Sequence, residues 1–293
     1  MKKLLVIAEQ QEGPQDALEK AVDLAKKTGA AIHVAVFCYE PMAVLAVYQS
    51  DQDGVDLKVK LIRHKEEWWH QFILDNQYGV EISYEVIWEK NISEWIIKHS
   101  QMVHYDLILK TGHRSETTFH TPTDWQLFRD SSVPVYIVTK KRSKPKNNIL
   151  VALDVLAKSA EKQRLNKKLI EHAFRLSIQA GVVLHCAYVI KIPTFLKDLE
   201  LIDNENYIHK ARNEVKTKLS ALIQDYDLPS DCIHIKEGEP WGVLSTLAKK
   251  LHVQCVVVGS MGRKGLAGKL IGNTAEKIIH VVKTDLMVIS PEA

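Results

Sequence analysis

An internal repeat constrains the fold of this chain more than any other feature of its sequence. The run from Asp16 to Phe37 (DALEKAVDLAKKTGAAIHVAVF) matches the run from Lys168 to Val189 (KLIEHAFRLSIQAGVVLHCAYV) without a gap, and Gly29 falls opposite Gly181. A repeat of this length predicts two copies of one folding unit, and 293 residues leave room for two domains.

Each half alternates helical and strand patterns. Apolar residues recur at helical spacing before Gly29 and Gly181, and each glycine is placed to end its helix in the left-handed conformation. The strands are continuous apolar runs, which is typical of a parallel sheet covered on both faces by helices. We therefore predict an α/β fold with two tandem doubly wound domains. Each domain is expected to hold a five-stranded parallel sheet that ends at Val135 to Thr139 or at Leu286 to Ser290.

The boundary between the halves is a polar, basic stretch, KKRSKPKNN (Lys140 to Asn148), in which Pro145 interrupts any regular element. We predict domains at residues 1–140 and 147–293. A nucleic-acid contact at this stretch is the alternative to a solvated linker, and the linker is favoured.

Charge and cysteine usage exclude several classes of function. The chain has 39 basic and 36 acidic residues, a net charge of +3, which is too small to indicate nucleic-acid or membrane binding. No apolar run approaches the roughly 20 residues that span a bilayer, and the one in MKKLLVIAEQ predicts a buried strand. The cysteines lie in apolar runs without a CxxC pair, which predicts reduced thiols and a cytoplasmic protein. They are Cys38, Cys186, Cys232 and Cys255.

A glycine-rich loop follows the fourth expected strand of the second half, within VVVGSMGRKGLAGKLIGNTAEKII (residues 256–279). Gly259 and Gly262 are followed by nine residues and then Gly272. Glycines at a strand end let ligand atoms approach backbone N–H groups. Asn273 is a candidate N-cap with Glu276 three residues later, so the free N–H groups of a helix would face the same space and favour an anion.

Charge in the loop points to a polyphosphate. Arg263, Lys264 and Lys269 are present without an acidic residue. The alternative is a flexible turn in which Asn273 only caps a helix, and composition does not decide between the two. The dinucleotide motif, the P-loop and the nucleophile elbow all fail to match.

The pattern GxxGx9G, together with the first strand ILVALD (Ile149 to Asp154) and the last strand DLMVIS, resembles the universal stress protein family. The resemblance covers the whole chain as two repeats and implies an adenine nucleotide alpha hydrolase-like fold. The family contains both ATP binders and members that bind none. The resemblance implies ATP, with Mg²⁺, as an expectation. It also implies that fifth strands pair, which predicts an internal pseudo-dimer.

The resemblance further implies a nucleotide site in the second half. Ala152 and Asp154 would contact adenine and ribose, and Cys186 would line the base pocket. The remaining residues would hold ribose and phosphates: Val258, Gly259, Gly262, Arg263, Gly272, Asn273 and Thr274. The family places Ser or Thr directly after the last glycine, whereas this chain has Asn there and Thr one residue later.

The first half lacks this loop. In LILKTGHRSETTFHTPTDWQLF, Lys110, His113 and Pro122 stand near the three glycine positions, and Glu9 replaces the aspartate. We predict a domain that binds no nucleotide and serves a structural or partner-binding role. The alternative is that Lys110, His113 and Arg114 hold another anion.

The leading hypothesis is a cytoplasmic stress-response protein that binds ATP in its second half and has a second copy of itself as a candidate partner. No catalytic residue is evident, so hydrolysis is expected to be weak at most. The alternatives are a true ATPase that recruits Asp154 or His252, and a scaffold in which neither half binds nucleotide. The 13 histidines show no repeated metal-ligand spacing, so no metal site is expected.

Overall fold

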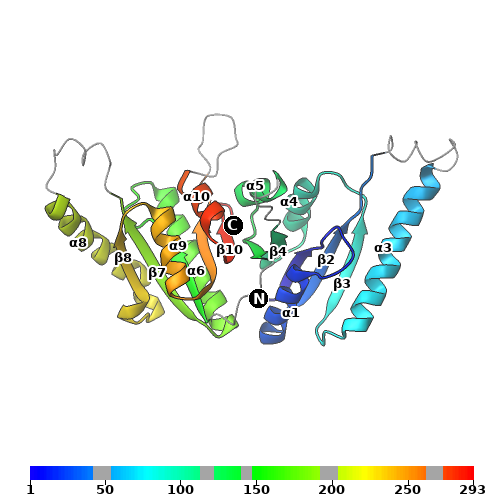
Figure 1. Ribbon diagram of the computed structural model, residues 1–293, viewed down its shortest axis with the longest axis horizontal. Helices are drawn as coiled ribbons and strands as arrows, with labels where there is room; N and C mark the ends of the chain where they lie inside the picture. The colour runs from blue at the N-terminus through cyan, green and yellow to red at the C-terminus, as the bar shows by residue number, and fades with distance from the viewer. Residues whose placement is uncertain (42–53, 113–121, 140–146, 192–203, 262–272) are drawn as a thin grey trace.

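The computed structural model of the chain describes residues 1–41, 54–112, 122–139, 147–191, 204–261 and 273–293, in which helices and strands alternate (Figure 1). The first half contains β1 (Lys3–Ile7), α1 (Asp16–Thr28), β2 (Ala31–Phe37), α3 (Gly54–Asn76), β3 (Ile82–Ile87), α4 (Ile92–Met102), β4 (Leu107–Gly112), α5 (Pro122–Asp130) and β5 (Val135–Thr139). The second half contains β6 (Asn148–Ala152), α6 (Ala160–Ala180), β7 (Val183–Ile190), α8 (Asn204–Ile223), β8 (Ile233–Glu237), α9 (Pro240–Lys250), β9 (Val253–Gly259), α10 (Asn273–Val281) and β10 (Asp285–Ile289).

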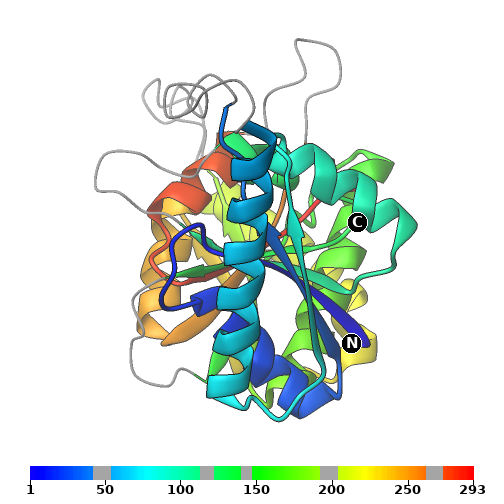
Figure 2. The same cartoon turned by 90° about the vertical axis from the view of Figure 1, so that its right-hand side faces the viewer.

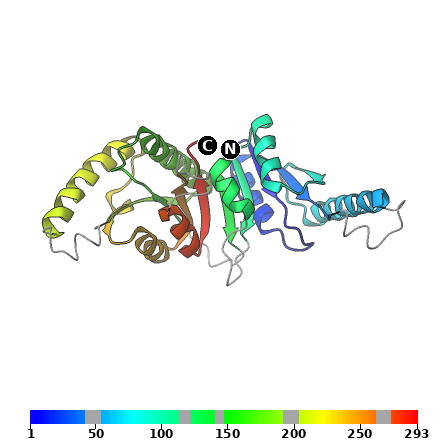
Figure 3. The same cartoon turned by 90° about the horizontal axis from the view of Figure 1, so that it is seen from above.

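The strands of both halves form one ten-stranded sheet, in the order β3-β2-β1-β4-β5-β10-β9-β6-β7-β8. Neighbouring strands are parallel within each half, and β5 meets β10 antiparallel, with Met287 opposite Tyr136. Figure 3 shows the two halves side by side, with β5 and β10 adjacent between them. The predicted five-stranded parallel sheets are confirmed. Their fifth strands cover each other's edges, which apolar edge strands require.

Helices cover both faces of the sheet. Buried residues of α1, α3, α6 and α8 join one hydrophobic core, and those of α4, α5, α9 and α10 join a second core on the other face. Figure 2 shows α3 running along the sheet at one end of the molecule, and α8 lies at the opposite end in Figure 1. Along β9, Val257 belongs to the first core, while Val256 and Val258 belong to the second. Burial on both faces explains why the strands read as continuous apolar runs.

Gly29 and Gly181 end α1 and α6 as predicted. Their φ angles are 70° and 65°, in the left-handed region, and the N–H of Gly29 donates to the carbonyl of Ala25. A residue with a Cβ is strained in this conformation, so the glycines stop the two helices at equivalent points of the repeat.

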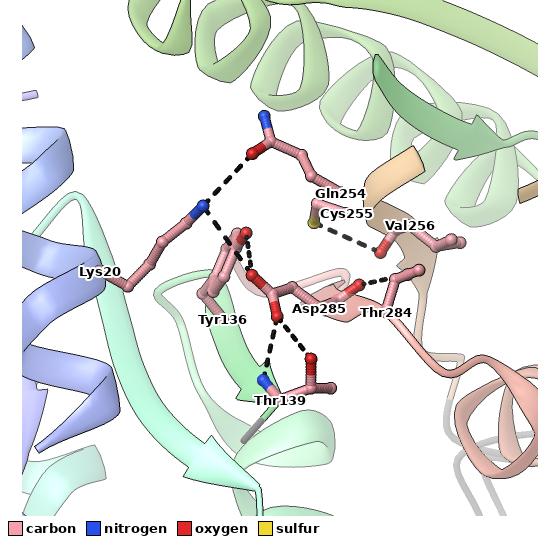
Figure 4. Close-up of polar contacts among 8 residues, drawn as sticks. All are labelled: Lys20, Tyr136, Thr139, Gln254, Cys255, Val256, Thr284 and Asp285. Atoms are coloured by element: carbon pink, nitrogen blue, oxygen red, sulfur yellow. Dashed lines mark hydrogen bonds and ion pairs between the residues drawn. The ribbon is translucent and has the colours of Figure 1, made fainter. Parts of the chain in front are cut away.

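A nearly buried carboxylate fastens β10 to the first half (Figure 4). The hydroxyl of Tyr136 donates to Asp285 Oδ2 at 3.0 Å, and the backbone N–H and hydroxyl of Thr139 each donate to Oδ1 at 2.9 Å. Lys20 Nζ, which reaches over from α1, lies 3.8 Å from Oδ2 and donates to Gln254 Oε1 at 3.4 Å. These contacts fix how the second half sits against the first.

Two further contacts join the halves where α5 and α10 lie next to each other (Figure 1). The hydroxyl of Ser260, just after β9, donates to the carbonyl of Phe128 on α5. The indole of Trp125 packs edge-on against the imidazole of His280, with ring centroids 5.4 Å apart. The helix that begins after the glycine loop is therefore held by the first half.

Candidate functional site

A cavity of about 680 Å³ opens at the carboxyl ends of β6, β7 and β9. Its walls include Ala152 at the end of β6, Asp154 just after it, Val258 and Gly259 at the end of β9, and Ala275 on α10. This volume is within the range of small-molecule sites, and doubly wound sheets bind ligands at this end of their strands.

Asp154 is held by its backbone, which leaves its carboxylate accessible. Its N–H donates to Asn166 Oδ1 at 2.9 Å, and Asn166 Nδ2 donates back to its carbonyl at 2.8 Å. Asn166 is only 5% exposed, so this pair of hydrogen bonds is shielded from water. The carboxylate accepts from Lys162 Nζ at 3.0 Å, but both side chains are about half exposed, and such ion pairs contribute little. A ligand hydroxyl can therefore replace Lys162 at low cost.

Gly259 lies where α6 packs close to β9. A Cβ built at this position would lie 2.7 Å from Leu165 Cδ2 and 3.3 Å from Leu169 Cδ1, and the φ of Gly259 is not positive. The absence of a side chain thus lets α6 approach the strand. From the sequence we expected Gly259 only to let a phosphate approach the backbone. The structure adds that Gly259 also allows close packing of α6 on β9.

The polar groups of the cavity suit an anion. The lining includes Lys162 and Lys191 but Asp154 as its only acidic member among the described residues. Because Ala275 lines the cavity, the first turn of α10 also reaches it, and the free N–H groups of a helix start favour negative charge. Burial, with a smaller contribution from Asp154, raises the pKa of Tyr188 to about 12, so its phenol is a neutral hydrogen-bonding group at pH 7.

Four of the predicted nucleotide-binding residues line this cavity: Ala152, Asp154, Val258 and Gly259. Three others lie outside the described residues, namely Gly262, Arg263 and Gly272. Two more of the predicted residues, Asn273 and Thr274, are the first two residues of α10, directly before Ala275. Helix α10 begins at Asn273, and the residue before it lies outside the described residues.

Cys186 lies apart from the cavity. Its side chain is fully buried in the core beneath α6 and α8, and burial raises the pKa of its thiol to about 12. The next two residues of β7, Ala187 and Tyr188, line the cavity instead.

Sequence reasoning missed three residues that shape the site, namely Leu165, Asn166 and Tyr188. Asn166 had a usable signal, because it is a polar residue at a helical position between the buried Leu165 and Leu169. Tyr188 and Leu165 had none, since an apolar run does not show which residue faces a cavity.

The equivalent place in the first half is filled by contacts within the chain. Strand register puts Thr111 where Gly259 stands, one residue beyond Lys110, and the Thr111 hydroxyl accepts from the N–H of Ala17 at 3.1 Å. Lys110 Nζ lies 2.9 Å from the fully buried carboxylate of Asp124. Glu9, the counterpart of Asp154, accepts from the N–H of Asp16 at the start of α1. Groups that could have met a ligand are thus engaged by the protein.

The profile of the universal stress protein family matches the chain twice, over residues 1–139 and 146–290. The chain belongs to the universal stress protein family. It is similar to universal stress protein E of Escherichia coli (strain K12), with 28% identity over 298 residues that cover 99% of this chain and 94% of that protein. The universal stress protein E homolog of Haemophilus influenzae is also 28% identical, and the match covers 99% of this chain and 97% of that protein.

Solved structures of the family share the fold. A putative universal stress protein from Pseudomonas aeruginosa matches with a TM-score of 0.71 and 23% identity, over 99% of this chain and 94% of that chain. Two universal stress protein domains therefore lie in tandem here. Across the described residues, none of the helices has the length and apolar character needed to cross a membrane.

Proposed function

We propose that this protein binds ATP in the cavity of its second domain and acts in the stress response through nucleotide occupancy. The observation that supports this most is the convergence of Asp154, Val258 and Gly259 with the start of α10 around one cavity of about 680 Å³. The base and ribose would lie by Asp154 and the end of β7, and the phosphates by the loop that precedes α10.

Magnesium fits this arrangement as a companion of the phosphates. Mg²⁺ keeps several waters and is usually held by phosphate oxygens with one or two carboxylates. Asp154 is the one carboxylate that lines the described part of the cavity, and ribose would engage it, so phosphate oxygens and water would hold the ion. No described lining residue is thus placed to activate a water, so hydrolysis would be slow at most.

The proposal extends to the organisation of the chain. Domains at 1–140 and 147–293 would form an internal pseudo-dimer through β5 and β10, in the cytoplasm, with the first domain in a structural or partner-binding role. At the equivalent place in the first domain, Lys110 is paired with Asp124. This pairing supports the proposal that only the second domain binds nucleotide.

The test is calorimetric titration of the whole protein with ATP and Mg²⁺, after a denatured sample has been checked for co-purified nucleotide by mass spectrometry. Asp154→Ala should weaken ATP binding about 10- to 100-fold, since a hydrogen bond to a charged group contributes about 1.5–3 kcal/mol. The half-exposed position of Asp154 leaves the fold intact.

The matched control is Glu9→Ala at the equivalent position of the first domain, which should leave ATP affinity unchanged. Unaltered affinity in Asp154→Ala, or equal loss in both variants, would contradict the site. Absence of any ATP binding by the wild-type protein would favour the scaffold alternative.

A further inference from the structure

A second cluster of chemically active side chains lies in the first domain, away from the strand ends that form the nucleotide cavity. His33 on β2, Glu85 on β3 and His99 on α4 each offer one ligand atom, and these three atoms all lie within 4.8 Å of one another. His33 Nε2 is 2.9 Å from Glu85 Oε1. Because the three residues come from distant parts of the chain, no sequence spacing could announce the cluster.

Neighbouring side chains hold both imidazoles in place. Ser83 Oγ is 2.9 Å from His33 Nδ1, and the hydroxyl of Tyr105 is 2.9 Å from His99 Nε2. Trp95 stacks on His99 with ring centroids 4.3 Å apart and an interplanar angle of 11°. Metal-binding histidines are typically oriented by such outer contacts, which fix the ring and the tautomer.

The cluster is also accessible. The side chain of Glu85 is 41% exposed and that of His33 is 15% exposed, so a hydrated ion can reach them. Zinc ligands lie about 2.0–2.2 Å from the metal, and two of them at a tetrahedral angle are roughly 3.4 Å apart. No two of these ligand atoms are more than 4.8 Å apart, so a separation has to close by at most roughly 1.4 Å to reach this spacing.

The second domain contains an incomplete version of the same arrangement. His185 stands at the position of His33, and strand register places His234 at the position of Glu85, with His185 Nδ1 3.1 Å from His234 Nε2. The eighth residue of α9, however, is Leu247, whereas the eighth residue of α4 is His99. The repeat thus supplies a natural comparison that lacks the third ligand.

We propose that His33, Glu85 and His99 form a binding site for a divalent transition-metal ion such as Zn²⁺, with water completing the coordination. Two imidazoles and one carboxylate form a donor set that binds such ions in preference to Mg²⁺ or Ca²⁺. The site is independent of the nucleotide proposal, because it lies in the other domain and uses none of the cavity residues.

The test titrates the whole protein with ZnCl₂ alone, without nucleotide, by calorimetry, and repeats the titration with Co²⁺ to record its visible absorption. We expect one ion per chain in the first domain. His33→Ala, His99→Ala and Glu85→Gln should each weaken binding at least about tenfold, because even loss of an outer contact costs 10–100-fold in metal affinity.

The matched control is the double variant His185→Ala/His234→Ala, which should bind Zn²⁺ with unchanged affinity. Zn²⁺ should also raise the thermal unfolding temperature of the wild-type protein and of this control, but not of His99→Gln. His99→Gln retains a polar side chain and replaces His99→Ala in the test if the alanine variant folds poorly. The proposal is overturned if wild type binds no Zn²⁺, if the three single variants bind as wild type does, or if the control variant loses the ion.

Discussion

Replacement of Asp285 by alanine should weaken the junction between the two domains more than any single surface change. Its carboxylate accepts from Tyr136 and twice from Thr139, with a side chain only 15% exposed. Thr139 is partly exposed, so water can satisfy its groups after the substitution. Tyr136 is 1% exposed, and its hydroxyl would be left without a strong acceptor, because the Cys255 thiol beside it is a weak one.

The size of the effect follows from these contacts. Hydrogen bonds to a charged acceptor contribute about 1.5–3 kcal/mol, and a stranded buried hydroxyl costs about 1–3 kcal/mol. Because Thr139 is rescued by water, we expect Asp285→Ala to lower the free energy of unfolding by about 3–5 kcal/mol. Tyr136→Phe alone should cost about 1–2 kcal/mol, but in the Asp285→Ala background it should cost nothing, since it removes the stranded group.

Urea unfolding measures these changes in the free energy of unfolding. The transition is monitored by circular dichroism, which reports on the whole chain, and by tryptophan fluorescence. Five of the six tryptophans lie in the first half, so fluorescence reports mainly on that domain. The two transitions should coincide in the wild type and separate in Asp285→Ala. The exposed Asp225→Ala is the control, expected within about 0.5 kcal/mol of wild type. A loss below about 1 kcal/mol in Asp285→Ala, or additive effects with Tyr136→Phe, would refute the reasoning.

Three further predictions follow from burial. Gly259→Ala should destabilise the protein by about 1–3 kcal/mol because its Cβ meets Leu165, and Leu165→Ala in the same chain should make the alanine at 259 nearly neutral; urea midpoints of the four proteins of this cycle decide it. Burial raises the pKa of Cys186 from 9.0 to about 12, so above about pH 9 the unfolded chain loses a proton that the native state keeps, and stability should fall by up to about 1.4 kcal/mol per pH unit. The slope of the unfolding free energy between pH 9 and pH 10.5 should be shallower in Cys186→Ala, and equal slopes would contradict this. Burial lowers the pKa of His185 and His234, so below about pH 6.5 the unfolded state binds protons that the native pair does not. The free energy of unfolding should therefore decrease as the pH is lowered. The fall between pH 7 and pH 5 should be smaller in His185→Ala, as thermal unfolding can show.

Much of the fold could be read from local pattern. The stop glycines, the alternation of helices and strands, and the parallel sheet all follow from short stretches of sequence and were confirmed, because each depends on backbone conformation or on burial on both faces. The pairing of β5 with β10 was predicted from family resemblance, and the structure shows it as one continuous sheet. Asp285 could not be identified in this way, because its partners Tyr136 and Thr139 lie far away in sequence.

The internal repeat was enough to show two related domains, and the family resemblance placed Asp154, Val258 and Gly259 at one end of the second sheet. Which of their neighbours share the cavity depends on tertiary packing, because a local apolar run does not show how far each strand extends toward the helices that close the cavity. Cys186 was lost from the site because it lies before the carboxyl end of β7, where Ala187 and Tyr188 reach the cavity, and Asn166 was gained through a contact across twelve residues. The cluster of His33, Glu85 and His99 is the clearest case: its members are unremarkable in the sequence, and the fold brings them together through strand pairing and the packing of α4.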